Sequence, residues 1–253
     1  MLESYLRARL DKKDILLMTH IVLGYPSCED AFRIIRAMVE AGVDLMELQI
    51  PFSEPIADGP VILRANQESL MRGARVQHCL ELAEKAARTF DIPFLIMTYY
   101  NIPYKYGTDN FVSTMAKGNL RGSIIPDLPP EEGREYLNAM RKHDLAPVFI
   151  FSPTTSIERM NYLAGFARGF VYCVARKGVT GSDTTFSKEL GHYLSRCRVA
   201  TSLPLALGFG IKEKADIDFL KGKADIAVIG TQTLRIMDDR GVDSVGDFIR
   251  SLR

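Results

Sequence analysis

Eight short segments of the chain are almost continuously apolar and rich in strand-forming residues. They cover residues 15–23, 43–49, 93–99, 122–126, 146–151, 169–174, 204–209 and 224–229. A strand with one face in water alternates apolar and polar residues, whereas a strand covered on both faces is apolar throughout. We therefore expect eight buried strands that belong to a parallel sheet.

Helical patterns fill the stretches between these strands. Residues 29–41 and 76–90 repeat apolar side chains at three- and four-residue spacing. Ser27 is placed to cap the first of these helices, and Pro129 and Pro130 are expected to open another over 131–143. Successive strands begin about 20 to 35 residues apart, except for a gap of about 50 after the second strand, which leaves room for an additional helix.

This regular alternation predicts an α/β fold, a single-domain (βα)8 or TIM barrel that spans residues 1–253. The charged amphipathic segment MLESYLRARLDKKD adds an extra N-terminal helix, and the long gap adds an extra helix after strand 2. No glycine- or serine-rich linker divides the chain. The alternative is an open doubly wound sheet, which would most often carry a GxGxxG turn after strand one, where this chain reads LGYPS.

Charge and cysteine usage narrow the range of partners. The 32 lysines and arginines nearly balance 31 aspartates and glutamates, so the net charge is +1 and indicates neither nucleic acid nor a membrane as partner. Apolar runs stay far below the ~20 residues that cross a bilayer. No residue spacing indicates a metal site, and the pattern of scattered cysteines predicts a cytoplasmic protein; they are Cys28, Cys79, Cys173 and Cys197.

Two carboxylates mark the end of the second strand, and barrel active sites lie at the carboxyl ends of strands. Glu47 is enclosed by apolar neighbours, where a carboxylate is costly unless it is paired or used. It is either a general acid–base or a structural acid that pairs with a neighbouring strand. Asp58, in the loop IADGP, either faces Glu47 across the barrel mouth or caps the helix that opens at Pro60.

Glycine-containing segments follow the last three strands. They are RKGVTGSD with Gly178 and Gly181, ALGFGIK with Gly208 and Gly210, and VIGTQTL with Gly230 and Thr231. Barrels often bind phosphate in this corner, where backbone N–H groups of loops and a helix N-terminus converge. Each segment alone is equally consistent with a tight turn, but the three together favour a phosphate site.

Other polar residues near strand ends have no single interpretation from the residues alone. Tyr172 on strand six and Tyr99 at the end of strand three are either core tyrosines or part of the site. Asp127 after strand four is expected to cap the following loop, with a supporting role at the site as the alternative. His20 on strand one faces the barrel mouth or the core.

Across nearly its whole length the chain resembles the α subunits of tryptophan synthase. The matching segments are LGYPS at 23–27, AGVDLMEL at 41–48, PFSEPIADGP at 51–60, MTYYN at 97–101, PDLPPEE at 126–132, SPTT at 152–155, RGFVYCVARKGVTG at 168–181 and GFGI at 208–211. The resemblance implies retro-aldol cleavage of indole-3-glycerol phosphate to indole and D-glyceraldehyde 3-phosphate, a late stage of tryptophan biosynthesis. It implies catalytic roles for Glu47 and Asp58. It also implies substrate binding by Tyr172, Tyr99, Thr180, Gly181, Gly210, Gly230 and Thr231.

The same resemblance implies an αββα heterotetramer in which the β subunit, and not this chain, carries pyridoxal phosphate. Residues 51–55 and the loop after strand six are implied as the contact surface. The chain departs from the family pattern where Gln49 replaces a usual glycine, Glu54 a usual aspartate and His20 a usual aromatic or aliphatic residue. Two alternatives stay open: a stand-alone lyase that releases indole, and a noncatalytic α-like activator of a β subunit.

Overall fold

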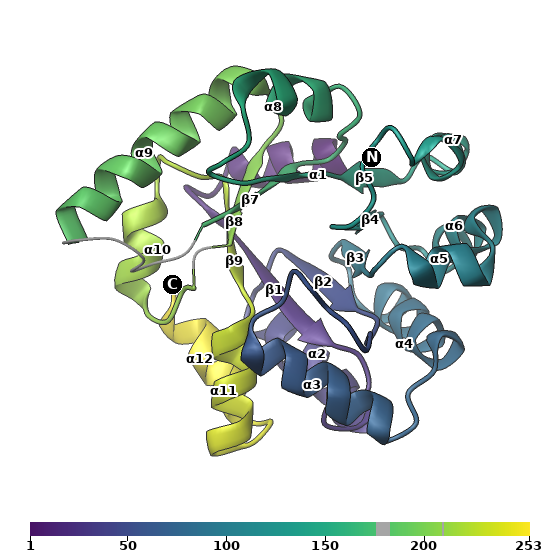
Figure 1. The fold of residues 1–253 in the computed structure, drawn as a ribbon. Coiled ribbons are helices and arrows are strands. Elements are labelled where there is room, and N and C mark those ends of the chain that lie inside the picture. Colours follow the sequence, from purple (N-terminus) through teal and green to yellow (C-terminus); the bar gives the residue numbers. More distant parts are fainter. Residues whose placement is uncertain (176–182, 209) are drawn as a thin grey trace.

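The strands of the described chain are all parallel to their neighbours and follow one another around a single sheet. The computed structural model describes residues 1–175, 183–208 and 210–253 (Figure 1). The sheet order is β5-β4-β3-β2-β1-β9-β8-β7-β6. The strands are β1 (Leu16–Val22), β2 (Leu45–Gln49), β3 (Phe94–Met97), β4 (Gly122–Ile124), β5 (Ala146–Val148), β6 (Ile150–Phe151), β7 (Val171–Val174), β8 (Leu205–Gly208) and β9 (Ile226–Ile229).

Strands β5 and β6 are the two halves of the fifth expected strand, and they close the sheet into a barrel. Only Phe149 separates them, and β5 pairs with β4 while β6 pairs with β7. The carbonyl of Phe149 still accepts the N–H of Tyr172 at 3.0 Å, so hydrogen bonding to β7 continues through the break. The (βα)8 barrel expected from the sequence is therefore confirmed, and the open doubly wound sheet is wrong.

Helices surround the barrel (Figure 1). The expected N-terminal helix is α1, and α3 and α4 together provide the extra helix after β2. Short helices after β3 and at the C-terminus, α5 and α12, were not predicted. The helices are α1 (Leu2–Leu10), α2 (Cys28–Glu40), α3 (Pro60–Met71), α4 (Val76–Thr89), α5 (Asn101–Tyr106), α6 (Thr108–Lys117), α7 (Arg134–Lys142), α8 (Ile157–Ala164), α9 (Asp183–Ala200), α10 (Lys214–Leu220), α11 (Thr231–Arg240) and α12 (Ser244–Ser251).

Helix boundaries agree with the expected signals at α2 and differ at α7. The Ser27 side chain caps α2 by accepting the N–H of Asp30 at 3.0 Å, as predicted. Helix α7 begins at Arg134 and not at the two prolines. The carbonyls of Pro129 and Pro130 accept the N–H groups of Glu132 and Gly133, so the Pro-Pro-Glu-Glu segment forms turns before the helix starts.

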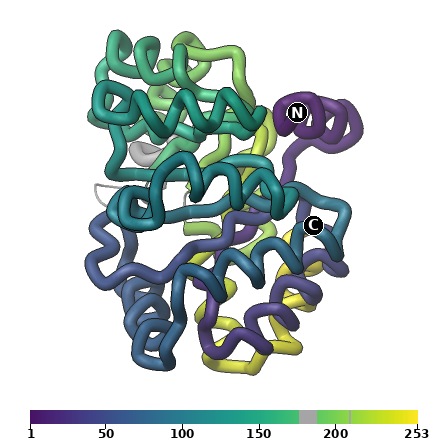
Figure 2. The backbone as a smooth tube through the Cα atoms, turned by 90° about the vertical axis from the view of Figure 1, so that its right-hand side faces the viewer, coloured from purple at the N-terminus to yellow at the C-terminus, as the bar shows by residue number. Residues whose placement is uncertain are grey.

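Helix α1 covers the amino-terminal end of the barrel. Its Leu2 and Leu6 pack into the apolar cluster inside the barrel, together with strand residues such as Leu16 and Phe170. Gly169 leaves room for this contact, because a Cβ there would lie 2.7 Å from the Leu2 side chain. In Figure 2 the purple α1 lies at the right-hand end of the molecule.

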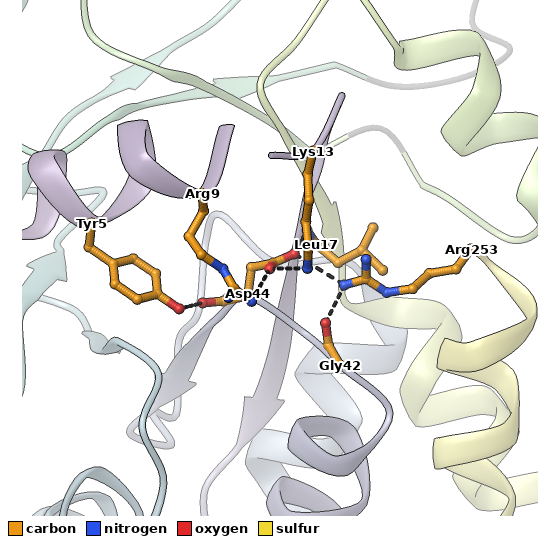
Figure 3. A network of polar contacts seen from close by, with 7 residues as sticks. All are labelled: Tyr5, Arg9, Lys13, Leu17, Gly42, Asp44 and Arg253. Atoms are coloured by element: carbon orange, nitrogen blue, oxygen red, sulfur yellow. Dashed lines mark hydrogen bonds and ion pairs between the residues drawn. The ribbon is translucent and has the colours of Figure 1, made fainter. Parts of the chain in front are cut away.

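A buried carboxylate ties α1 and the C-terminus to this amino-terminal end (Figure 3). Asp44 is fully buried just before β2, and its oxygens accept from Arg9 at 2.9 Å, Lys13 at 2.5 Å and Arg253 at 3.2 Å. The Leu17 N–H also donates to Asp44, at 3.0 Å. Burial raises the pKa of Asp44, but Lys13, the Leu17 N–H and Arg9 outweigh it and lower the pKa overall.

No helix in the described ranges combines the length and apolar character that crossing a membrane requires.

Candidate active site

Glu47 lies on β2 at the centre of a polar group inside the barrel. Its side chain is 4% exposed, and the strand register sets it directly opposite His20 of β1. Nδ1 of His20 lies 3.0 Å from Oε1 of Glu47, and the Tyr172 hydroxyl of β7 donates to the same oxygen at 3.4 Å. Glu47 therefore pairs with a neighbouring strand, and because it also faces the barrel interior, its role as a general acid–base stays a prediction.

The environment fixes the protonation of the two partners of Glu47. Burial lowers the pKa of His20, but the hydrogen bond to Glu47 and the negative charges of Glu47 and Asp58 outweigh it, so the pKa is raised. This favours the imidazolium form. Burial, helped by the charge of Glu47, raises the pKa of Tyr172 far above its ordinary value. Tyr172 is therefore a neutral hydroxyl that donates to the carboxylate.

Asp58 is held by one side chain from β2 and another that follows β3. Its Oδ2 accepts from Gln49 Nε2 at 2.6 Å and from the Tyr99 hydroxyl at 3.3 Å, and that hydroxyl accepts the Ala57 N–H at 3.0 Å. The capping alternative is wrong, since Gly59 is the N-cap residue of α3 and no side chain caps it. Burial raises the pKa of Asp58 despite the nearby positive charge of His20.

Each carboxylate is anchored by one oxygen. Both contacts of Glu47 are to Oε1, and both contacts of Asp58 are to Oδ2. Within the described part of the chain, Oε2 of Glu47 and Oδ1 of Asp58 accept no hydrogen bond. The anchored oxygens fix the orientation of the two groups, and the other two are available to a ligand.

Aromatic side chains line the interior beside the carboxylates. Phe52 and Tyr99 stack with ring centroids 5.1 Å apart, and Phe52, Ile150 and Tyr172 pack against the apolar cluster inside the barrel. Gly208 of β8 makes space for the tyrosine, because a Cβ there would lie 3.1 Å from the Tyr172 ring. The site thus combines two carboxylates with walls suited to a flat aromatic ligand.

The glycine corner is described only in part. Gly230 is the N-cap residue of α11 and Thr231 its first residue, so the free N–H groups of this helix start lie at the carboxyl end of β9. Gly210 has a φ of 79°, and a Cβ at this position would meet no described atom within 4 Å, which leaves its backbone accessible. At α10 the side chain of Asp216 already accepts the N–H of Lys212 at 2.8 Å. Thr180 and Gly181, like Gly178, lie outside the described residues.

The prediction that Asp127 caps the loop that follows it is wrong, because its carboxylate holds the start of a helix that comes earlier in the chain. Both of its carboxylate oxygens accept the N–H of Tyr100, at 2.9 and 3.1 Å, immediately before α5. The described residues contain no group of three or more His, Cys, Asp or Glu side chains that could hold a metal.

The direct partners of the two carboxylates were not predicted from the sequence. His20 was expected to face the barrel mouth or the core, and Gln49 stood out only as a departure from a family pattern, but their contacts with Glu47 and Asp58 were not predicted. The signal was available in principle, since polar residues at 20, 47 and 49 share the inward face of two adjacent parallel strands. The exact register of those strands was the missing information.

Comparisons with known proteins identify the family of the chain. The family model described as tryptophan synthase alpha chain matches residues 6–248. The chain is 64% identical to the tryptophan synthase alpha chain of Desulforapulum autotrophicum and 60% identical to that of Syntrophotalea carbinolica, with all of each chain covered. Among solved structures, tryptophan synthase from Mycobacterium tuberculosis superposes with a TM-score of 0.91 at 28% identity, over 99% of this chain and 96% of that chain. The chain therefore belongs to the tryptophan synthase alpha chain family.

Proposed function

We propose that this protein cleaves indole-3-glycerol phosphate to indole and D-glyceraldehyde 3-phosphate, with Glu47 as the acid–base group and Asp58 as its electrostatic partner. Membership of the tryptophan synthase alpha chain family supports the lyase reaction. The observation that supports these residue roles is the pair of carboxylates at the carboxyl end of the barrel, Glu47 buried and Asp58 half-buried, each anchored by one oxygen.

The reaction moves one proton within the substrate. Indole C3 gains a proton, the neighbouring glyceryl hydroxyl loses one, and the electrons of the C–C bond return to the ring as the aldehyde forms. Glu47 is suited to both transfers, because it is inside an apolar wall and its Oε2 is unoccupied by described residues. Asp58 can stabilise the positive charge that develops on the ring nitrogen, through Oδ1.

The rest of the site would bind the two ends of the substrate. Phe52, Tyr99 and Tyr172 provide aromatic surface for the indole. The helix start at Gly230 and Thr231 and the open backbone of Gly210 provide N–H groups for the phosphate, and Thr180 and Gly181 are proposed to complete this pocket. A phosphate held by backbone dipoles needs no basic surface, in keeping with the net charge of +1.

The protein acts together with a β subunit in an αββα assembly, and pyridoxal phosphate belongs to that subunit. In this chain Glu54 and Ile56 are exposed in the loop after β2, and Ile56 is 83% exposed. The same loop carries Asp58, so a subunit docked on residues 51–56 would bear directly on the site. A cytoplasmic location is proposed from the scattered free cysteines.

One assay separates this function from its two alternatives. Purified protein is incubated with indole-3-glycerol phosphate, with and without a β subunit, and indole is measured. Since the chain contains no tryptophan, indole fluorescence in the mixture without β arises only from substrate or product. We expect slow cleavage alone and a large increase with β. Equally high activity without β indicates a stand-alone lyase. A protein that releases no indole in either mixture, but accelerates the reaction of the β subunit itself, is a noncatalytic activator.

A further inference from the structure

The two carboxylates are supported by two polar residues that sit side by side in the barrel. His20 of β1 contacts Glu47, and Gln49 of β2 contacts Asp58. Strands β1 and β2 are adjacent (Figure 1), and their register sets His20 opposite Glu47 and Val22 opposite Gln49. Glu47 and Gln49 are two residues apart and so share the inward face with His20. Side chains from the two strands therefore form one layer across the barrel interior.

Two side-chain atoms in this layer, one on His20 and one on Gln49, could form a hydrogen bond with each other. Nε2 of His20 and Oε1 of Gln49 are both buried with no hydrogen-bond partner among the described residues. Gln49 uses its Nε2 to donate to Asp58, so its amide presents an acceptor to the remaining side. Gln49 contributes to the raised pKa of His20, and no hydrogen bond joins the two side chains. Two buried unsatisfied groups are costly, and a small rotation that joins them removes the cost.

The charge on His20 suits this arrangement. The titratable groups that face it are Glu47 on β2, Asp58 after β2 and, through Glu47, Tyr172 on β7. Directly after β9, a Cβ on Gly230 would lie 3.3 Å from the His20 Cβ, and that residue brings no charge. Among the described residues, two acidic groups thus face one basic group. As an imidazolium, His20 donates from both ring nitrogens, to Glu47 and towards Gln49.

We propose that His20 and Gln49 are positioning residues that form one bridge, Glu47–His20–Gln49–Asp58, which orients both carboxylates of the lyase site together. The inference rests on the proposed function and adds two residues to it. Neither residue needs to touch the substrate, because each acts through the carboxylate that it holds.

The bridge gives the reaction a pH dependence on the alkaline side. As the pH rises through the raised pKa of His20, the imidazole loses one donor and its positive charge. The link to Gln49 is then broken and the two carboxylates face each other without a compensating charge. Activity is therefore expected to fall at high pH, through the titration of a group that is not itself catalytic.

A cycle of variants tests the bridge in the intact protein with its β subunit. His20→Phe removes both donors, and kcat is expected to fall about 10- to 100-fold with little change in KM. His20→Asn keeps a donor near the Nδ1 position, so most of kcat should return while the alkaline loss of activity disappears. Gln49→Gly should lower kcat as well. The double variant His20→Phe/Gln49→Gly should lose no more than the worse single variant, since either change breaks the same bridge.

A second measurement needs no substrate. The imidazole of His20, identified by the signal lost in His20→Asn, is titrated by NMR; it should titrate above the ordinary 6.5 and move down when Glu47 is changed to Gln. The bridge is overturned if the titration of His20 does not change in Glu47→Gln. It is also overturned if the kcat losses of the two single variants multiply in the double variant, or if His20→Phe keeps the pH profile of the unaltered protein. These outcomes are distinct from failure of the proposed function, which would appear as absence of indole from the unaltered protein.

Discussion

Nδ1 of His20 lies 3.0 Å from Oε1 of Glu47, across adjacent parallel strands that set the two residues directly opposite each other. The contact is almost fully buried, with side chains 5% and 4% exposed. It places a basic group beside the carboxylate that would carry protons in the reaction. The other carboxylate, Asp58, has no basic partner among the described residues and relies on neutral donors, so the two acids have different environments and can hold different roles.

Asp58→Asn is expected to abolish indole formation without weakening the fold. The pKa of Asp58 is raised in the folded protein, so its ionised form costs stability at pH values above that pKa, and the cost disappears as the pH falls. Asparagine removes the charge and keeps an oxygen for Gln49. The melting temperature at neutral pH should therefore be equal to or above that of the unaltered protein. A clear drop in melting temperature contradicts this assignment.

As the pH is lowered, the unaltered enzyme should begin to lose activity at a higher pH than an aspartate with an ordinary pKa would predict. Protonation of Asp58 removes the negative charge that is proposed to stabilise the substrate nitrogen. Since burial raises the pKa of Asp58, this loss begins at a pH above that set by the usual value of 3.8. A profile of kcat/KM against pH measures it, with circular dichroism at each pH to separate catalysis from unfolding.

Asp44→Asn is expected to destabilise the barrel while leaving its chemistry intact. The substitution leaves Arg9, Lys13 and Arg253 around a neutral group, and breaking a buried ion pair typically costs about 3 kcal/mol. For a domain of this size we expect a melting temperature roughly 10 °C lower. The pKa of Asp44 is lowered, so its contribution is present above the unfolded-state pKa and is lost as the pH falls through the folded one.

Asp218→Asn is the matched control for this change. Asp218 pairs with Lys214 and Lys221 on the exposed surface of α10, where ion pairs contribute little. Its melting temperature should match that of the unaltered protein. If the two substitutions destabilise equally, the network around Asp44 does not have the stabilising role assigned to it.

Gly208→Ala should impair substrate binding by moving Tyr172. The added Cβ would lie 3.1 Å from the tyrosine ring, closer than ordinary packing allows. The ring must shift, which disturbs both the wall of the site and the hydrogen bond to Glu47. We expect KM to rise several-fold and kcat to fall. Gly191→Ala in α9 is the control, because a Cβ on Gly191 would meet no described atom within 4 Å, and it should leave kcat and KM unchanged. Equal kinetics for the two variants would argue against the role of Gly208.

The sequence was sufficient to predict the barrel, because strands buried on both faces leave a strong apolar signal at regular spacing. It did not predict the break at Phe149, where pairing with β4 changes to pairing with β7, since strand partners are set by closure of the whole sheet. The short helices α5 and α12 were also missed. Each has eight residues or fewer, too short to show a clear apolar repeat.

At the site, the sequence indicated Glu47 and Asp58 but not what holds them. A carboxylate inside an apolar run is conspicuous in one dimension, whereas its partners come from other strands and depend on register. The role of Asp58 as a helix cap looked plausible locally and is overridden by contacts to Gln49 and Tyr99. Local signals therefore predicted which residues are unusual, and only the fold shows which of them meet.

The most direct test of the proposed mechanism is indole release by Glu47→Gln in the presence of a β subunit and saturating indole-3-glycerol phosphate. Glutamine has the same shape and can still accept from His20 Nδ1 and Tyr172, but it cannot take up or release a proton. We predict a folded protein that binds substrate and releases indole at least about 1000-fold more slowly, a loss of the size that removal of an acid–base group produces. Indole release at the rate of the unaltered protein would contradict the assignment of Glu47 as the acid–base group.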